Sequence, residues 1–97
     1  MDNLLIAEAA EEEYAKSLKW YAERNPRAAE GFEAAFGQAL ESIAAHPERY
    51  PLCDDRQRFF LLKRYAFHII YRKISENRWL IIALAHSSRR PGYWRNR

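Results

Sequence analysis

The spacing of the apolar residues changes once along this chain, and that change limits the folds it can adopt. Up to Ala45 the apolar residues recur at steps of three and four, which is typical of amphipathic helices. After a loop at 47–55 they follow a period of two in runs rich in aromatic and β-branched residues, which is typical of strands. Two helices followed by consecutive strands predict an α+β fold, with an antiparallel helical hairpin packed on one face of an antiparallel sheet.

The two expected helices meet at Asn25-Pro26. The first runs from about Glu8 to Arg24, and the second runs from there to Ala45. Asparagine is a good N-cap and proline is tolerated at the first helical position, so this pair ends one helix and begins the next. The second helix ends before Pro47, because the residue before a proline disfavours helical geometry. The apolar stripes are expected at Ala10, Tyr14, Ser17 or Leu18, and Tyr21, and then at Ala29, Phe32, Phe36, Ala39 or Leu40, and Ile43.

Three strands are expected after the loop, at 58–65, 67–74 and 79–85. The segment 75–78, Ser-Glu-Asn-Arg, suits a tight hairpin turn between the last two strands. Ala66 lies in the preceding turn, where a glycine would be the more favourable residue.

The period of two also predicts which side chains share a face of the sheet. Phe67, Ile69 and Tyr71 are expected to share one face of the sheet. Leu80, Ile82 and Leu84 are expected to face the helices. The opposite face of the sheet is expected to stay uncovered and to serve as a binding surface. The apolar run Leu4–Ala7 is too short for its period to distinguish an edge strand from the first turn of a helix.

Charge is divided unevenly between the two halves of the chain. Residues 1–48 hold four basic and ten acidic residues, a net charge of −6, and residues 49–97 hold twelve basic and three acidic residues, a net charge of +9. A basic half of this strength favours a phosphate-rich or acidic partner. The alternative is that the two halves neutralise each other within one fold.

The tail 86–97 gathers side chains that bind phosphate or stack on bases. It contains four arginines together with Tyr93, Trp94 and His86. Arginine makes bidentate contacts to phosphate or carboxylate, and the aromatic rings offer stacking surface. His86 at a strand end is a candidate acid or base. The alternative is structural, with both aromatic residues covering the edge of the core and the histidine merely hydrogen-bonded.

Other classes of site and location are disfavoured. Cys53 is the only cysteine, and no Cys/His cluster has the spacing of a zinc site. The run Glu11-Glu12-Glu13 is interpreted as a solvated helix face, because adjacent helical positions point in different directions. No apolar run is long enough to cross a bilayer, and the N-terminus lacks a secretory signal. We therefore expect one domain over 1–97, in the cytoplasm, with no metal and no membrane contact.

Short motifs follow one another in order over nearly the whole chain. They are Ala10…Trp20-Tyr21, Ala29…Phe32…Leu40…Ile43…Pro47, Arg58…Leu62, Tyr65-Ala66-Phe67-His68-Ile69-Ile70-Tyr71, Ile82-Ala83-Leu84-Ala85-His86 and Arg89-Arg90-Pro91-Gly92-Tyr93-Trp94. In this ordered set the chain resembles the RelE/ParE superfamily, the toxins of type II toxin–antitoxin (plasmid stabilisation) modules.

The resemblance implies both a fold and partners. Its fold is β-α-α-β-β-β, which favours the strand interpretation of Leu4–Ala7. It implies a cognate antitoxin whose C-terminal segment wraps the toxin and blocks its active surface. It also implies action in the cytoplasm, no cofactor, and contact with operator DNA only through the antitoxin.

The superfamily has two modes of action. RelE-like members cleave messenger RNA in the ribosomal A site with basic residues on the sheet and a C-terminal tyrosine, whereas ParE-like members inhibit DNA gyrase. RNA-cleaving members that resemble this chain carry two lysines on the strand corresponding to 59–62, where this chain has Phe-Phe-Leu-Leu. Apolar side chains cannot stabilise a transition-state phosphate, so a gyrase inhibitor that is not an enzyme is favoured.

Two alternatives remain open beside the gyrase inhibitor. One is a ribosome-dependent endoribonuclease, and the other is an inactive member that only binds antitoxin and helps to repress its operon. The candidate catalytic residues are His86, Arg89, Arg90 and Tyr93. The candidate residues for binding target or antitoxin are Arg58, Lys63, Arg64, Arg72, Arg89, Arg90, Tyr93, Trp94 and Arg95.

Overall fold

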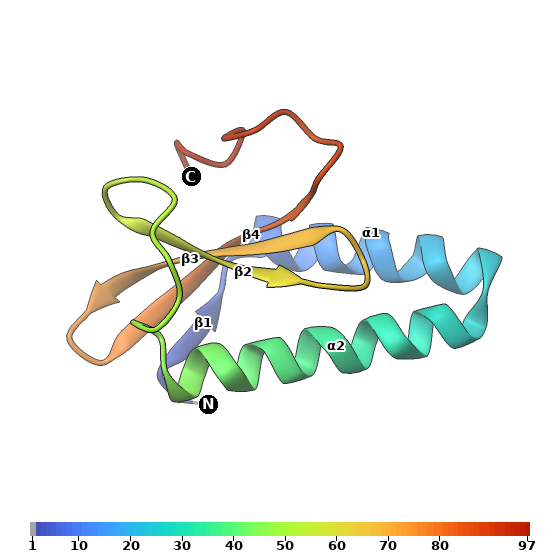
Figure 1. Cartoon of the computed structure of the whole chain (residues 1–97), viewed down its shortest axis with the longest axis horizontal. Coiled ribbons are helices and arrows are strands. Elements are labelled where there is room, and N and C mark those ends of the chain that lie inside the picture. The colour runs from blue at the N-terminus through green and yellow to red at the C-terminus, as the bar shows by residue number, and fades with distance from the viewer. Residues whose placement is uncertain (1) are drawn as a thin grey trace.

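The computed structural model describes residues 2–97 and contains six elements in the expected order (Figure 1). They are β1 (Leu4–Ile6), α1 (Glu8–Arg24), α2 (Pro26–Ala45), β2 (Gln57–Leu62), β3 (Phe67–Ser75) and β4 (Arg78–His86). The sheet order is β1-β4-β3-β2, in which β1 is parallel to β4 and the other pairs are antiparallel. The α+β prediction is confirmed, and so is the strand at the N-terminus. No helix within residues 2–97 has the length and apolar character that crossing a bilayer requires.

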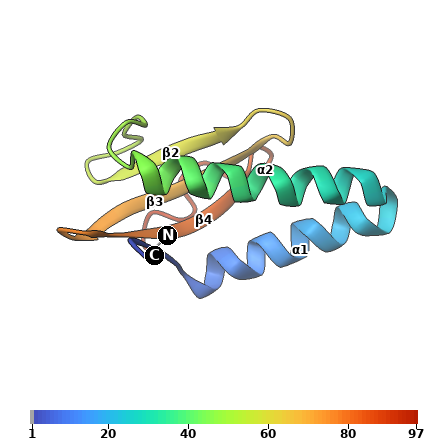
Figure 2. The ribbon, with the colours of Figure 1, turned by 90° about the horizontal axis from the view of Figure 1, so that it is seen from below.

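Asn25 joins the two helices, as the sequence predicts. Its backbone N–H donates to the Tyr21 carbonyl oxygen at 2.7 Å, which closes the last turn of α1. Its side-chain oxygen accepts hydrogen bonds from the N–H groups of Arg27 and Ala28, which caps the start of α2. One residue therefore ends the first helix and begins the second, and the hairpin turns sharply enough for the two helices to pack side by side (Figure 2).

The main core lies between this hairpin and one face of the sheet. The predicted stripe of α2 faces it, and Phe32 and Ile43 are fully buried. Aromatic stacking joins the two helices, because the ring of Tyr14 in α1 lies 4.4 Å from that of Phe36 in α2. Phe67, Ile69, Tyr71, Trp79, Ile81 and Leu84 complete the core from the sheet. The shared face predicted for Phe67, Ile69 and Tyr71 is confirmed.

A β-bulge in β4 makes part of the predicted pattern wrong. Tyr71 pairs with Ile81, but the preceding residue, Ile70, pairs with Ala83, so β4 holds one extra residue at Ile82. The extra residue reverses the alternation of faces on its two sides. Leu84 faces the helices as predicted, whereas Leu80 and Ile82 face the opposite side.

The face of the sheet opposite the helices is not uncovered, which corrects the prediction of an open binding surface. The C-terminal tail, here residues 87–97, folds back over it (Figure 1). The Trp94 side chain is buried there against Ile70, Ile82, Ala83 and Ala85. This second, smaller core gives the sheet a layer on each face, and any binding surface on the tail side is therefore made by the tail itself.

Candidate functional site

The tail is built from tight turns anchored by one aromatic side chain. Backbone hydrogen bonds close the turns, among them Arg89 N–H to the His86 carbonyl oxygen at 3.0 Å and Arg97 N–H to the Trp94 carbonyl oxygen at 3.0 Å. Gly92 has a φ of +77°, a conformation that favours glycine, and a Cβ added there would lie only 2.7 Å from the Arg95 guanidinium. The sequence therefore turns the chain at Pro91-Gly92 and returns Trp94 to the sheet.

Glu13 of α1 is the centre of a polar cluster that attaches the tail to the domain. Its carboxylate accepts hydrogen bonds from the Leu84 backbone N–H at 3.0 Å and from the Tyr93 hydroxyl at 2.6 Å. It also forms a bidentate pair with Arg97, at 2.9 Å and 3.1 Å. Only 13% of the Glu13 side chain is exposed. We call Glu13, Tyr93, Arg97 and the Leu84 N–H the Glu13 cluster.

The cluster fills a gap at the edge of the sheet. β1 pairs with β4 at Trp79, Leu80 and Ile81, and beyond Ile81 no strand within the described residues 2–97 pairs with the outer edge of β4. There Glu13 accepts the Leu84 N–H, and Arg97 donates to the Ile82 carbonyl oxygen at 3.0 Å. Two side chains thus satisfy backbone groups that a longer β1 would otherwise pair.

The cluster shifts two pKa values in opposite directions. Burial alone would raise the pKa of the Glu13 carboxyl, but hydrogen bonds from Arg97, Tyr93 and the Leu84 N–H lower it below its ordinary value of 4.5. Burial and the hydrogen bond to Glu13 raise the pKa of Tyr93 to about 12. At neutral pH the carboxylate is therefore charged and the tyrosine hydroxyl holds its proton as a donor.

We predict an acid-dependent loss of stability from this carboxylate. A lowered folded-state pKa adds stability that is present above the unfolded pKa of 4.5 and is lost as the pH falls through the folded pKa. The free energy of unfolding of the wild type should therefore fall more steeply between about pH 5 and pH 3 than that of Glu13→Gln. Urea unfolding at a series of pH values measures this difference. Parallel pH profiles for the two proteins would contradict it.

Tyr93 is held between two arginines. The Arg89 guanidinium carbon lies 3.9 Å from the ring centroid, and that of Arg97 lies 5.0 Å from it. Arg89 also approaches Glu13, with 3.9 Å between Nη1 and Oε2. Both candidate residues Arg89 and Tyr93 therefore belong to a local network of stacking and hydrogen bonding.

His86 at the end of β4 takes part in local contacts. Its Nδ1 accepts a hydrogen bond from the Ser88 N–H at 3.0 Å and lies 2.7 Å from the Ser88 hydroxyl oxygen. Its ring meets the Phe67 ring edge-on, with 4.9 Å between centroids. These contacts fit a residue that shapes the start of the tail.

The structure divides the remaining basic candidates between the tail and other parts of the fold. Arg58 donates to the carbonyl oxygens of Tyr50 at 2.7 Å and Glu48 at 3.2 Å, and so holds the loop before β2. Arg72 donates to the backbone oxygen of Arg97 at 3.0 Å. Lys63 and Arg64 are exposed in the turn between β2 and β3, and this turn meets the start of the tail through the hydrogen bond from the Ser87 N–H to the Ala66 carbonyl oxygen at 2.8 Å. Arg90 and Arg95 are exposed on the tail, where Arg95 lies over the Trp94 ring.

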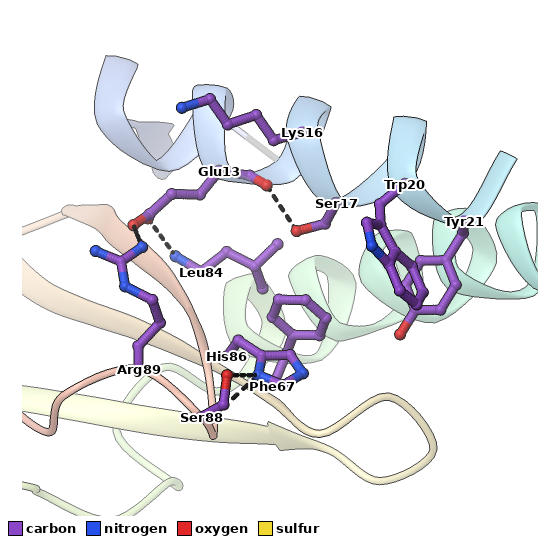
Figure 3. A pocket seen from close by; sticks show the side chains of 10 residues that line it. All are labelled: Glu13, Lys16, Ser17, Trp20, Tyr21, Phe67, Leu84, His86, Ser88 and Arg89. Carbon is purple, nitrogen blue, oxygen red and sulfur yellow. Dashed lines mark hydrogen bonds and ion pairs between the residues drawn. The ribbon is translucent and has the colours of Figure 1, made fainter. Parts of the chain in front are cut away.

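Two clefts flank the tail. A cleft of about 290 Å³ lies between the tail and the sheet, and its lining includes His68, His86, Arg90 and Arg95. A cleft of about 460 Å³ lies between α1 and the end of β4 (Figure 3). Arg89 and His86 line both clefts. Within residues 2–97 no group of three or more His, Cys, Asp or Glu side chains is placed to hold a metal ion.

Glu13 and Arg97 were missed by the sequence interpretation. The prediction that Glu11-Glu12-Glu13 form a solvated helix face is wrong for Glu13, whose side chain is largely buried. Glu11 and Glu12 are exposed as expected. A signal was available, because Glu13 lies three residues after Ala10 and one before Tyr14, at the border of the buried stripe of α1.

Comparison with known proteins identifies the family. Residues 4–91 match the family described as "ParE toxin of type II toxin-antitoxin system, parDE". The chain belongs to the ParE toxin family. It is therefore a toxin of the RelE/ParE superfamily. The matched segment includes Glu13 and Arg89 and ends before Tyr93, so the second half of the Glu13 cluster lies outside it.

A solved structure agrees with this ParE fold. It is described as "Chromosomal ParDE TA system from P. aeruginosa", with 14% sequence identity and a TM-score of 0.63. The similarity covers 87% of this chain and 94% of the other, and at this identity it supports the fold alone. No curated protein sequence matches the chain.

Proposed function

We propose that this ParE toxin inhibits DNA gyrase by binding, and that a cognate antitoxin neutralises it. The observation that carries the proposal is the state of the Tyr93 hydroxyl. It donates a hydrogen bond to Glu13 at 2.6 Å, and burial together with this bond raises its pKa to about 12. The hydroxyl is therefore already engaged with a partner and stays protonated at neutral pH. A tyrosine held in this way is a structural donor and is poorly placed to act on a phosphate.

The strand where RNA-cleaving relatives carry lysines supports the same conclusion. Phe60 and Leu62 of β2 pack on the helix side, and Phe59 packs on the tail side against His68, with 5.5 Å between ring centroids. Leu61 is exposed and apolar. This stretch therefore offers no cation to stabilise a phosphate in the transition state.

The exposed arginines of the tail provide a surface for a large acidic target. Among residues 2–97, Arg90 and Arg95 form no ion pair within 4 Å, and Arg95 lies over the ring of Trp94, which fixes the tail to the sheet. Exposed positive charge on a tail that is packed against the sheet steers an acidic or DNA-bound partner toward it. The antitoxin is proposed because the structural neighbour is described as a ParDE toxin–antitoxin system.

The second candidate function is RNA cleavage, and one observation favours it. The smaller cleft brings His68 and His86 together with Arg89, Arg90 and Tyr93, residue types that could bind and cleave a phosphodiester. A third candidate is a toxin without activity that acts only as a co-repressor with its antitoxin.

Expression of the chain in bacteria without an antitoxin separates the three candidates. A gyrase inhibitor should arrest growth with filamentation and an induced DNA-damage response. Rapid loss of translation with cut messages would instead indicate ribonuclease action. Harmless expression of the folded protein would leave the co-repressor as the remaining candidate.

We predict that Tyr93→Phe keeps its toxicity. The variant removes one hydrogen bond to Glu13, which costs about 1–2 kcal/mol of stability, but it retains the ring that stacks on Arg89. Growth arrest at matched expression level should therefore stay close to that of the wild type. Loss of toxicity in a variant that circular dichroism finds folded would contradict gyrase binding and favour chemistry at the hydroxyl.

A further inference from the structure

The smaller cleft, between the tail and the sheet, is lined by basic side chains and by no acidic one. Arg89, Arg90 and Arg95 line it together with His68 and His86. Among residues 2–97, no Asp or Glu side chain contributes to this lining. Arginine guanidinium groups bind phosphate through paired hydrogen bonds, so a lining of this composition is suited to a phosphate-bearing ligand.

Two of these arginines carry charge that the fold does not neutralise. Arg90 and Arg95 are exposed and form no ion pair within 4 Å among residues 2–97. The Asp54 carboxylate, in the loop before β2, instead accepts hydrogen bonds from the backbone N–H groups of Arg56 and Gln57, at 2.9 Å and 2.7 Å. A bound anion would therefore meet unpaired positive charge at this cleft.

The positive surface continues from the cleft into the turn between β2 and β3. The Ser87 N–H donates to the Ala66 carbonyl oxygen at 2.8 Å, which joins this turn to the start of the tail. Lys63 and Arg64 are exposed in the same turn and form no ion pair within 4 Å in the described part of the chain. Basic groups on two adjoining segments match an extended polyanion better than a single small anion.

The aromatic rings of the cleft are already packed against other side chains. Tyr93 lies between two guanidinium groups, at 3.9 Å and 5.0 Å from its ring centroid. Trp94 is buried against the sheet, and the Phe59 ring meets the His68 ring edge-on at 5.5 Å. Proteins that bind single-stranded nucleic acid stack successive bases on aromatic faces. None of these three aromatic residues is exposed, so the cleft favours the phosphates of a duplex over unpaired bases.

We propose that this cleft and the adjoining turn bind the phosphate backbone of double-stranded DNA. The inference rests on the proposed function, because duplex DNA is the substrate that gyrase holds, and it names what the exposed arginines contact in that complex. Arg90 and Arg95 bind backbone phosphates, and Lys63 and Arg64 extend the contact along the same duplex. Such contacts position a protein on DNA and carry no base specificity. The toxin thus recognises gyrase together with its DNA.

Fluorescence anisotropy of a short labelled DNA duplex measures this binding with the purified full-length toxin. At about 50 mM salt we expect binding that weakens steeply as salt is added, because released counterions contribute to it. Arg90→Gln and Arg95→Gln should each raise the Kd by about fivefold or more, since each removes a charged hydrogen-bond donor to phosphate. Each should also reduce the slope of log K against log salt by about one.

Arg27→Gln is the matched control. Arg27 is an exposed arginine of α2, and this helix packs on the face of the sheet opposite the tail. The substitution should therefore change the Kd by less than about twofold. Equal losses of affinity in Arg27→Gln and in the two cleft variants would overturn the inference, because the binding would then depend on net charge alone.

The other outcomes separate this inference from the proposed function. A wild type that inhibits gyrase but binds no duplex at low salt overturns the inference alone. Tighter binding to a single-stranded RNA of the same length than to the duplex also overturns it, since the cleft would then recognise unpaired bases. Duplex binding that the cleft variants lose, without inhibition of gyrase by the wild type, supports the DNA site and contradicts the proposed function.

Discussion

Replacing Glu13 with alanine should lower the free energy of unfolding by about 2–4 kcal/mol and release the tail from the sheet edge. Among residues 2–97, the change removes the only side chain that accepts a hydrogen bond from the Tyr93 hydroxyl or from the Arg97 guanidinium. It also leaves the Leu84 N–H without its partner, at an edge of β4 that β1 does not reach. Unpaired donors beside two arginines make the docked tail unfavourable.

Urea unfolding measures the stability loss, and limited trypsin digestion reports the release, because the tail contains cleavable arginines at 89 and 95. Glu12→Ala is the matched control, since Glu12 is adjacent and exposed, and we expect it to cost less than about 0.5 kcal/mol. A Glu13→Ala protein with the stability and trypsin resistance of the wild type would contradict the role assigned to this carboxylate.

Trp94→Ala should destabilise the protein by about 3–5 kcal/mol, the usual cost of removing a large buried aromatic side chain. Trp94 is the largest side chain of the smaller core, and it covers Ile70, Ile82, Ala83 and Ala85. Without it these residues would line a cavity or face water once the tail detaches. Trp20→Ala, at an exposed tryptophan, serves as the control and should change stability by less than about 1 kcal/mol.

The stability losses caused by Glu13→Ala and Trp94→Ala should not be additive. Both act on the attachment of the same tail, so the double variant Glu13→Ala/Trp94→Ala should lose less stability than the two single losses together. Fully additive losses would mean that Glu13 and Trp94 act on separate parts of the fold, and would contradict a tail that docks as one unit.

The elements of this fold were predictable from the sequence because local signals define them. Asn25-Pro26 ends one helix and caps the next, and the stripe of Phe32, Phe36 and Ile43 faces the core as the helical period requires. The turn at 75–78 joins β3 to β4, and Ala66 adopts the positive φ of 54° that its turn demands.

The errors come from contacts between distant residues. The bulge at Ile82 exchanges the faces on either side of it, and nothing local in an apolar run marks the extra residue. The covered sheet face depends on Trp94 returning over β3 and β4, a contact that pattern alone could not separate from an exposed aromatic. Glu13 pairs with Arg97, 84 residues away, so its role was hidden in a run of three glutamates.

Neutralisation within the fold explains part of the charge imbalance, and binding of an acidic partner stays a prediction. Glu13 in the acidic half pairs with Arg97 and approaches Arg89, and Glu48 pairs with Lys73, so part of the basic half is neutralised within the fold. Arg90, Arg95, Lys63 and Arg64 have no such partner within 4 Å among residues 2–97. Part of the remaining positive charge is therefore exposed on the tail and on the turn between β2 and β3.

The most direct test of the proposed gyrase inhibition is to measure DNA supercoiling by purified gyrase in the presence of the purified toxin. The proposed function predicts a concentration-dependent loss of supercoiling, with no cleavage of messenger RNA when the same toxin is added to translating ribosomes. Gyrase that stays fully active at every toxin concentration, together with cut messages in the ribosome assay, would contradict it.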